Sequence, residues 1–131
     1  MIYTSYFAKY KGDNGIAITR YRPKWWKGEW MPSLAPSIDL LNWWKSLSKE
    51  EQQATGNIVE YTDRFIKETL MPIGKDLETL AKSLEGKVLL CYENLDKDFC
   101  HREVVAQWFT VHGFKCEELD YNYGENKDGK E

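Results

Sequence analysis

The chain has 131 residues, of which 42% are hydrophobic, 15% aromatic and 30% charged. This length accommodates one domain, and the aromatic side chains supply enough apolar area for a core. Residues 1–10 contain no long apolar run, and no stretch approaches the roughly 20 apolar residues that a membrane span needs. We therefore predict a cytoplasmic protein without a membrane partner. We expect one domain over residues 1–121, followed by a polar, flexible tail over residues 122–131.

The net charge of −3 conceals an uneven distribution. Residues 9–30 carry six Lys or Arg against two acidic residues, whereas residues 115–131 carry three Lys against six Asp or Glu. The basic segment favours, though weakly, a polyanionic partner. The three cysteines, Cys91, Cys100 and Cys116, have no paired spacing, so in a cytosolic protein we expect reduced thiols and not a disulfide framework.

Short candidate strands alternate with helices along the chain. The predicted strands are residues 2–7, 16–19, 88–92 and 114–121. The third of them is a continuous apolar run, which is typical of a strand covered on both faces. Residues 25–36 contain one glycine and two prolines, so we interpret them as an ordered loop.

The predicted helices cover residues 37–47, 48–70, 75–84 and 99–112. Ser37 is expected to cap the first helix, and the spacing of Ser48 and Glu51 predicts a capping box for the second. Gly56 is a candidate break within the second helix, and Pro72 is expected to end it. The last two helices are expected to stop at glycines, Gly86 and Gly113. The fourth helix should face the core with Val104, Val105, Trp108 and Val111.

This alternation predicts an α/β fold, a three-layer Rossmann-like sandwich with a short, mainly parallel sheet flanked by helices. In such folds, ligands bind beyond the carboxyl ends of the strands. Those ends would be residues 6–9, 20–26 and 92–102. Three segments that lie far apart in the sequence are therefore expected to meet at one edge of the sheet.

Reactive residue types are concentrated after the predicted strand at residues 88–92. Asp98 is a natural N-cap, which would place Cys100 and His101 in the first helical turn, where free amides and the helix dipole favour a thiolate or a bound anion. Arg102 would add a clamp for phosphate or carboxylate. Alternatively, the cysteine packs as a small apolar side chain, the histidine caps locally and the arginine is solvated.

Cys91, Cys100 and His101 supply three soft ligands, the number that a catalytic zinc ion needs. Their spacing matches no zinc motif, and adjacent Cys and His residues rarely share one ion, so the sequence favours no metal site and a buried structural Cys91. Glu93 follows a buried strand and is the best candidate for a general acid or base, although a solvated surface position explains it equally well. The candidate catalytic residues are Cys91, Glu93, Cys100 and His101, and no cofactor is indicated.

Aromatic and basic side chains alternate in the N-terminal third of the chain, at Tyr21, Arg22, Trp25, Trp26 and Trp30. Nucleic-acid bases stack on such rings while cations meet the phosphates, although the rings could instead pack together under a long loop. The end of the first strand offers hydroxyl groups, either to a ligand or to the loop backbone. The candidate ligand-binding residues are Thr4, Ser5, Tyr6, Arg20, Trp25, Trp26 and Arg102.

Several of these residues stand together in motifs. The motifs are Leu90-Cys91-Tyr92-Glu93, Phe99-Cys100-His101-Arg102, Tyr3-Thr-Ser-Tyr-Phe-Ala8, Ile16-Ala-Ile18, Trp25-Trp26-Lys27-Gly28 and Leu34-Ala-Pro36. Over about residues 1–119 the chain resembles the domain of unknown function 488 family. The resemblance implies an intracellular α/β domain and favours a functional site at Cys91, Glu93, Cys100, His101 and Arg102. It implies no particular activity.

The leading hypothesis is an enzyme that acts on a nucleotide or a nucleic acid. A phosphate would meet the helix start at Cys100 and Arg102, and Glu93 would act as acid or base. Tyr6, Trp25 and Trp26 would form a wall against the base or the sugar. The alternative is a non-catalytic module that binds single-stranded nucleic acid or a protein, and a third hypothesis is a metal-dependent site. The sequence indicates neither the reaction nor the oligomeric state.

Overall fold

The computed structural model describes residues 1–92 and 99–119 of the chain. Within them, five parallel strands form one sheet in the order β3-β2-β4-β1-β5. The strands are β1 (Ile2–Tyr6), β2 (Gly15–Ala17), β3 (Glu29–Trp30), β4 (Val88–Cys91) and β5 (Cys116–Glu118). The predicted α/β sandwich with a mainly parallel sheet is confirmed. The short β3 lies inside the segment that was predicted to be a loop.

The central strand β4 explains much of this topology. All four of its residues are buried, and it pairs with β1 on one side and with β2 on the other. A strand without a polar face needs cover on both faces and neighbours on both edges. The continuous apolar run at residues 88–92 therefore predicted its central position correctly.

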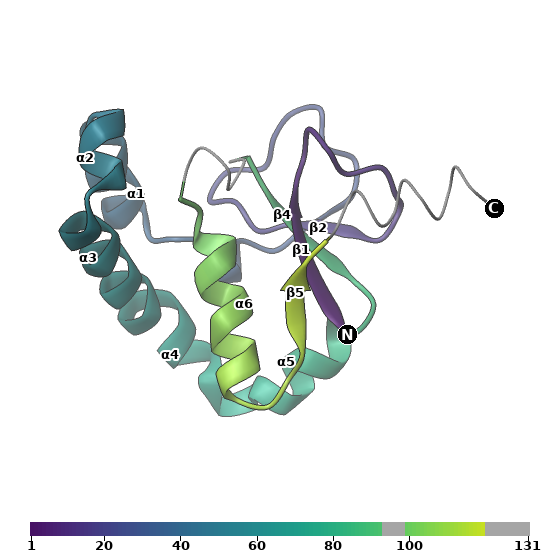
Figure 1. Cartoon of the computed structure of the whole chain (residues 1–131). Coiled ribbons are helices and arrows are strands. Elements are labelled where there is room, and N and C mark those ends of the chain that lie inside the picture. The colour runs from purple at the N-terminus through teal and green to yellow at the C-terminus, as the bar shows by residue number, and fades with distance from the viewer. Residues whose placement is uncertain (93–98, 120–131) are drawn as a thin grey trace.

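The helical elements are η1 (Pro32–Leu34), α1 (Ile38–Ser46), α2 (Lys49–Gln53), α3 (Thr55–Phe65), η2 (Ile66–Leu70), α4 (Met71–Ile73), η3 (Gly74–Asp76), α5 (Leu77–Ser83) and α6 (His101–Val111). In the view of Figure 1, helices α1–α4 and α6 lie to the left of the strands and α5 lies below them. Helix α6 contacts β1, β4, β5 and also α3. The core therefore lies between the sheet and these helices, and includes Ile2, Leu89, Phe65, Val105 and Phe109.

Both predicted helix caps are confirmed. The Ser37 hydroxyl accepts the Leu40 amide at 3.1 Å, and Ser48 and Glu51 form a reciprocal capping box. The predicted break at Gly56 is wrong, because the chain leaves the helix at Ala54, which has an extended ψ of 130°. Gly56 instead lies in the first turn of α3, where a side chain would meet open space.

Pro72 does not end the helical segment. Met71, the residue before it, keeps helical angles of φ −60° and ψ −42°, and Pro72 lies in the first turn of α4. Inside a continuous helix, a proline is accommodated most readily where the hydrogen-bond register changes. The π-helical turn η2 that precedes α4 is where the hydrogen-bond register changes.

Helix α6 differs from the prediction at both ends. It begins at His101 with Cys100 at the N-cap position, and Cys100 makes no side-chain capping bond. Val111 was expected to face the core, but it is 81% exposed, and Phe109 takes the inward position in the last turn. The predicted stop at Gly113 is confirmed by its φ of +92°, as is that at Gly86 by its φ of +78°.

Some predictions fall on residues that the structure does not describe. They concern Glu93, the Asp98 cap, the end of the last strand at residues 120–121 and the tail at residues 122–131. Among the described residues, no helix combines the length and the apolar character that crossing a membrane requires.

Candidate functional site

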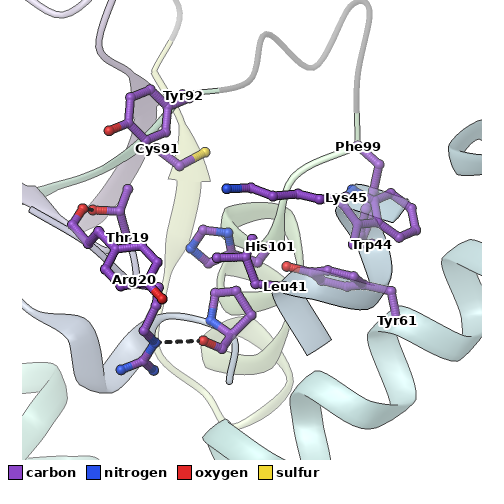
Figure 2. A pocket seen from close by; sticks show the side chains of 12 residues that line it. Thr19, Arg20, Leu41, Trp44, Lys45, Tyr61, Cys91, Tyr92, Phe99 and His101 are labelled. Carbon is purple, nitrogen blue, oxygen red and sulfur yellow. Dashed lines mark hydrogen bonds between the residues drawn. The ribbon is translucent and has the colours of Figure 1, made fainter. Parts of the chain in front are cut away.

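A cavity of about 250 Å³ opens at the carboxyl edge of the sheet, beside the start of α6 (Figure 2). Its lining comes from the segment after β2, from α1 and α3, from the end of β4 and from the start of α6. Two of the three predicted strand-end segments thus meet here. None of the described cavity-lining residues comes from the segment after β1.

One wall of the cavity is aromatic. Trp44, Tyr61 and Phe99 contact one another edge to face, with ring centroids 4.8–5.8 Å apart. Such contacts hold the rings in fixed positions. Two further tyrosines line the cavity, Tyr21 and Tyr92, and they are 59% and 53% exposed. The cavity therefore offers ring faces both inside and at its rim.

Among the described residues that line the cavity, two are cations, Arg20 and Lys45. The Arg20 guanidinium donates to the carbonyl oxygens of Pro36 at 2.9 Å and Pro32 at 3.3 Å, so it holds the chain before α1 in place. Lys45 is exposed, and Figure 2 shows its ammonium group directed toward the part of the cavity that holds His101. Of these two, the sequence had indicated only Arg20.

Cys91 and Cys100 are joined by a disulfide that connects the end of β4 to the residue before α6. The expectation of three reduced thiols is therefore wrong for this pair. The sequence spacing gives no sign of the bond, because it depends on how the strand end and the helix start meet in space. Cys116 is the free cysteine, and it is buried on β5.

The His101 side chain is only 7% exposed and lies against this disulfide. Its Nε2 is 2.6 Å from the Ile18 carbonyl oxygen, which can only accept, so Nε2 carries the proton. The lone pair is then on Nδ1, which is 3.7 Å from the Cys100 sulfur. The pKa of His101 is lowered to about 4, chiefly by burial and also by the Arg102 charge, while the bond to Ile18 partly offsets these effects. The imidazole is therefore neutral at neutral pH.

Arg102 is directed away from the cavity. Its side chain is fully buried and pairs with Glu118 in two bonds, Nε to Oε1 at 3.0 Å and Nη2 to Oε2 at 2.8 Å. Its Nη1 donates to the Cys91 sulfur at 2.9 Å, and its guanidinium lies 5.3 Å from the centre of the Tyr6 ring. The guanidinium thus connects α6 to β1, β4 and β5.

Of the candidate hydroxyls of β1, that of Thr4 belongs to the same buried cluster. Thr4 is buried and donates its hydroxyl proton to Glu118 at 2.7 Å, while Ser5 is fully buried in the sheet. Thr4, Ser5 and Tyr6 are absent from the described lining of the cavity. Glu118, to which Thr4 and Arg102 converge, was missed by the sequence reasoning, since its only visible signal was membership of the last predicted strand.

Trp25 and Trp26 belong to an aromatic group beside the cavity. Phe7 contacts Trp25 at 4.9 Å, Trp26 at 5.2 Å and Tyr92 at 5.3 Å between ring centroids. Tyr10 lies 6.4 Å from Trp26 and completes this Phe7 cluster. Tyr92 lines the cavity as well, so the Phe7 cluster adjoins the cavity through one shared ring.

The fold and the cavity together define the class of protein: a small parallel α/β domain with a candidate ligand site between a strand end and a helix start. The sequence model DUF488-N3a, described as the active DUF488-N3 subclade, matches residues 6–113. The chain therefore belongs to the domain of unknown function 488 family, and the resemblance seen in its motifs is confirmed. Comparisons with curated proteins and with solved structures gave no significant match.

Proposed function

We propose that this domain is an enzyme directed at a nucleotide or a nucleic acid, and that it binds one base and an adjoining phosphate in the cavity. The observation that carries the proposal is the combination of a rigid aromatic wall with cations and with buried Cys91 and His101 in one cavity. Sites for small ligands are mostly apolar with a few polar groups that converge on the ligand, and this cavity has that composition.

The aromatic wall suits a base. Stacking on an aromatic side chain contributes about 1–3 kcal/mol per base, and Trp44, Tyr61 and Phe99 are already held in place by their mutual contacts. The volume of about 250 Å³ is close to the lower limit of about 300 Å³ for typical ligand pockets. It suits one nucleobase and excludes a duplex, so a base in nucleic acid would enter unstacked.

The phosphate is best assigned to Lys45, while Arg20 holds the chain before α1 in place. Lys45 is exposed at the cavity, and a lysine ammonium can follow a phosphate on its flexible stem. Arg102 was the candidate from the sequence, but its guanidinium is engaged with Glu118 and Cys91, which favours a positioning role. A phosphate role for Arg102, and catalytic roles for Cys91, Glu93, Cys100 and His101, stay predictions, and Glu93 lies outside the described residues.

A second candidate function is non-catalytic binding of single-stranded nucleic acid. The Phe7 cluster favours it, because Trp25 is 58% exposed and stands between the exposed cations Lys24 and Lys27. Successive bases stack on such rings while cations track the backbone. In that case the Phe7 cluster, and not the cavity, would contribute most of the affinity.

Calorimetric titration with nucleoside monophosphates and a short oligonucleotide tests the proposal. Lys45→Gln should weaken nucleotide binding about 5- to 10-fold, as expected for one charged hydrogen bond at a partly solvated site. The matched control is Lys82→Gln on α5, whose side chain is 77% exposed and which does not line the cavity. Equal affinity of the two variants would contradict the proposal, and a loss confined to Trp25→Ala would favour the second function.

A further inference from the structure

We infer that Cys91, Cys100 and His101, once the disulfide is reduced and both thiols have lost their protons, bind a zinc-class divalent metal ion at the edge of the cavity. The two sulfurs and a ring nitrogen lie within 4.8 Å of one another, and all three residues are buried. Sulfur and imidazole ligands in a dry site are those that zinc prefers. The sequence spacing favoured no metal, so this inference comes from the geometry alone.

The distance between Cys100 and His101 fits a shared ion, and the two sulfurs would separate on reduction to admit it. The Cys100 sulfur is 3.7 Å from His101 Nδ1. In a tetrahedral zinc site, with Zn–S of about 2.3 Å and Zn–N of about 2.0–2.1 Å, a sulfur and a nitrogen ligand stand about 3.6 Å apart. The Cα atoms of Cys91 and Cys100 are 7.5 Å apart. Disulfides usually span about 4.4–6.8 Å between Cα atoms, so this backbone has room for an ion between the two sulfurs.

The hydrogen bond to the Ile18 carbonyl oxygen orients the His101 imidazole for metal binding. A metal-binding histidine usually donates its second ring N–H to a carbonyl or carboxylate, which fixes the tautomer and orients the ring. His101 does this with the Ile18 carbonyl oxygen at 2.6 Å, and its Nδ1 lone pair is left on the side of the Cys100 sulfur. Adjacent Cys and His side chains can therefore share one ion here, because Cys100 precedes α6 in an extended conformation while His101 begins the helix.

The surrounding charges are balanced for two thiolates and a divalent cation. Arg102 donates to the Cys91 sulfur at 2.9 Å, a bond that stabilises a thiolate, and Glu118 offsets the guanidinium charge through two bonds. Two thiolates neutralise the ion, so the residues that the structure describes around it carry no large net charge. Hydrogen bonds to ligand atoms of this kind tune a metal centre and hold its ligands in place.

The fourth coordination position would face the cavity, because Cys91 and His101 both line it. Three protein ligands with an open position are typical of catalytic zinc, which lowers the pKa of a bound water and polarises a substrate oxygen. The metal inference concerns the same cavity as the proposed function but does not rest on it, since metal binding is measured without any nucleotide. The disulfide and the metal-bound form exclude each other, because both need the same two sulfurs.

Metal analysis of the chain without an affinity tag tests the inference. The protein is purified without chelator under argon, treated with a phosphine reductant, incubated with zinc and desalted. Wild-type protein and the control Cys116→Ala should retain about one zinc per chain, whereas Cys100→Ala and His101→Ala should bind at least about tenfold more weakly. Circular dichroism of each variant checks that it is folded.

Two readouts need no variant. Zinc should slow alkylation of Cys91 and Cys100 in the reduced wild-type protein and leave Cys116 unaffected, as measured by mass spectrometry. Cobalt(II) should give the sulfur-to-metal charge-transfer absorption of thiolate ligation and the visible bands of a tetrahedral site. The inference is overturned if reduced wild-type protein binds no stoichiometric zinc, or if the cobalt complex lacks thiolate absorption. It is also overturned if Cys116→Ala loses as much zinc affinity as Cys100→Ala does.

Discussion

Consecutive residues at the start of α6 serve two different regions of the molecule. On the sulfur–imidazole side, defined by Cys91, Cys100 and His101, the Cys91 and His101 side chains line a cavity. On the arginine–carboxylate side, defined by Arg102, Glu118, Thr4 and Tyr6, the polar groups bind one another. Cys91 joins the two sides, because it lines the cavity while its sulfur accepts a bond from Arg102.

The comparison of the two sides distinguishes residues that can bind a ligand from residues that position their neighbours. Where a buried polar group has its partners within the protein, as the Arg102 guanidinium has, the arrangement stabilises the fold and fixes the geometry of its neighbours. Where reactive atoms border a cavity with exposed rings and cations, a ligand can complete the arrangement. A run of reactive residue types in sequence therefore does not by itself identify which of them meet a ligand.

The largest effect is expected on the arginine–carboxylate side. Arg102→Ala should lower the free energy of unfolding by about 2–4 kcal/mol, because it removes a fully buried guanidinium that ties together three strands and a helix. We expect no larger loss, because the Glu118 side chain is 35% exposed and water can solvate its carboxylate once Arg102 is removed. Urea denaturation of the reduced proteins measures the change.

Arg64→Ala is the matched control for this substitution. Arg64 also pairs with a glutamate, Glu68 at 3.2 Å, but as a partly exposed pair one helical turn apart. Such pairs contribute less than about 1 kcal/mol. If Arg102→Ala and Arg64→Ala lowered the free energy of unfolding by similar amounts, the buried cluster would not have the structural role described for it.

A second, smaller effect distinguishes the cysteine on β5 from the pair beside the cavity. Burial, together with the smaller effect of the charges of Glu117 and Glu118, raises the pKa of Cys116 to about 12. The thiol stays protonated in the folded chain at pH 9, so its alkylation should be about 100-fold slower than in the urea-unfolded chain.

The same shift in pKa implies a pH dependence of stability. The pKa of Cys116 is higher in the folded chain than in the unfolded chain, so the thiol of the unfolded chain ionises at a lower pH. Ionisation of Cys116 therefore lowers the free energy of unfolding only as the pH rises from about 9 toward 12. Mass spectrometry of the alkylated peptide at pH 9 gives the rate. Equal rates in the folded and unfolded chain would show that Cys116 is accessible and would remove the contrast between the cysteines.

Much of the fold was predictable because local chemistry determines it. The apolar β4 could only be central, Ser37 and Ser48 could cap their own helices, and Gly113 could stop α6 through its positive φ. The errors arose where tertiary packing decides between local alternatives. Proline at position 72 fits a new helical turn as well as it ends an old one.

The site was predictable in part. The motif around residues 91–102 and Arg20 pointed to the edge of the sheet where the cavity lies, because strand ends meet there whatever the side-chain details. The partners of each side chain were not predictable: Arg102 resembles a solvent-facing anion clamp until Glu118 is placed beside it by the pairing of β1 with β5. Likewise, Trp44 and Tyr61 fit the apolar stripes of their helices, and only the fold shows that they also line a cavity.

The central claim is that the cavity beside α6 is where a ligand binds. Amide chemical shifts of isotope-labelled protein, followed during titration with nucleoside monophosphates, test it most directly because they locate binding. The account predicts shifts clustered at residues 19–21, at Trp44 and Lys45, and at the start of α6. Shifts confined to the segment of Trp25 and Trp26, or none with any nucleotide, would contradict it.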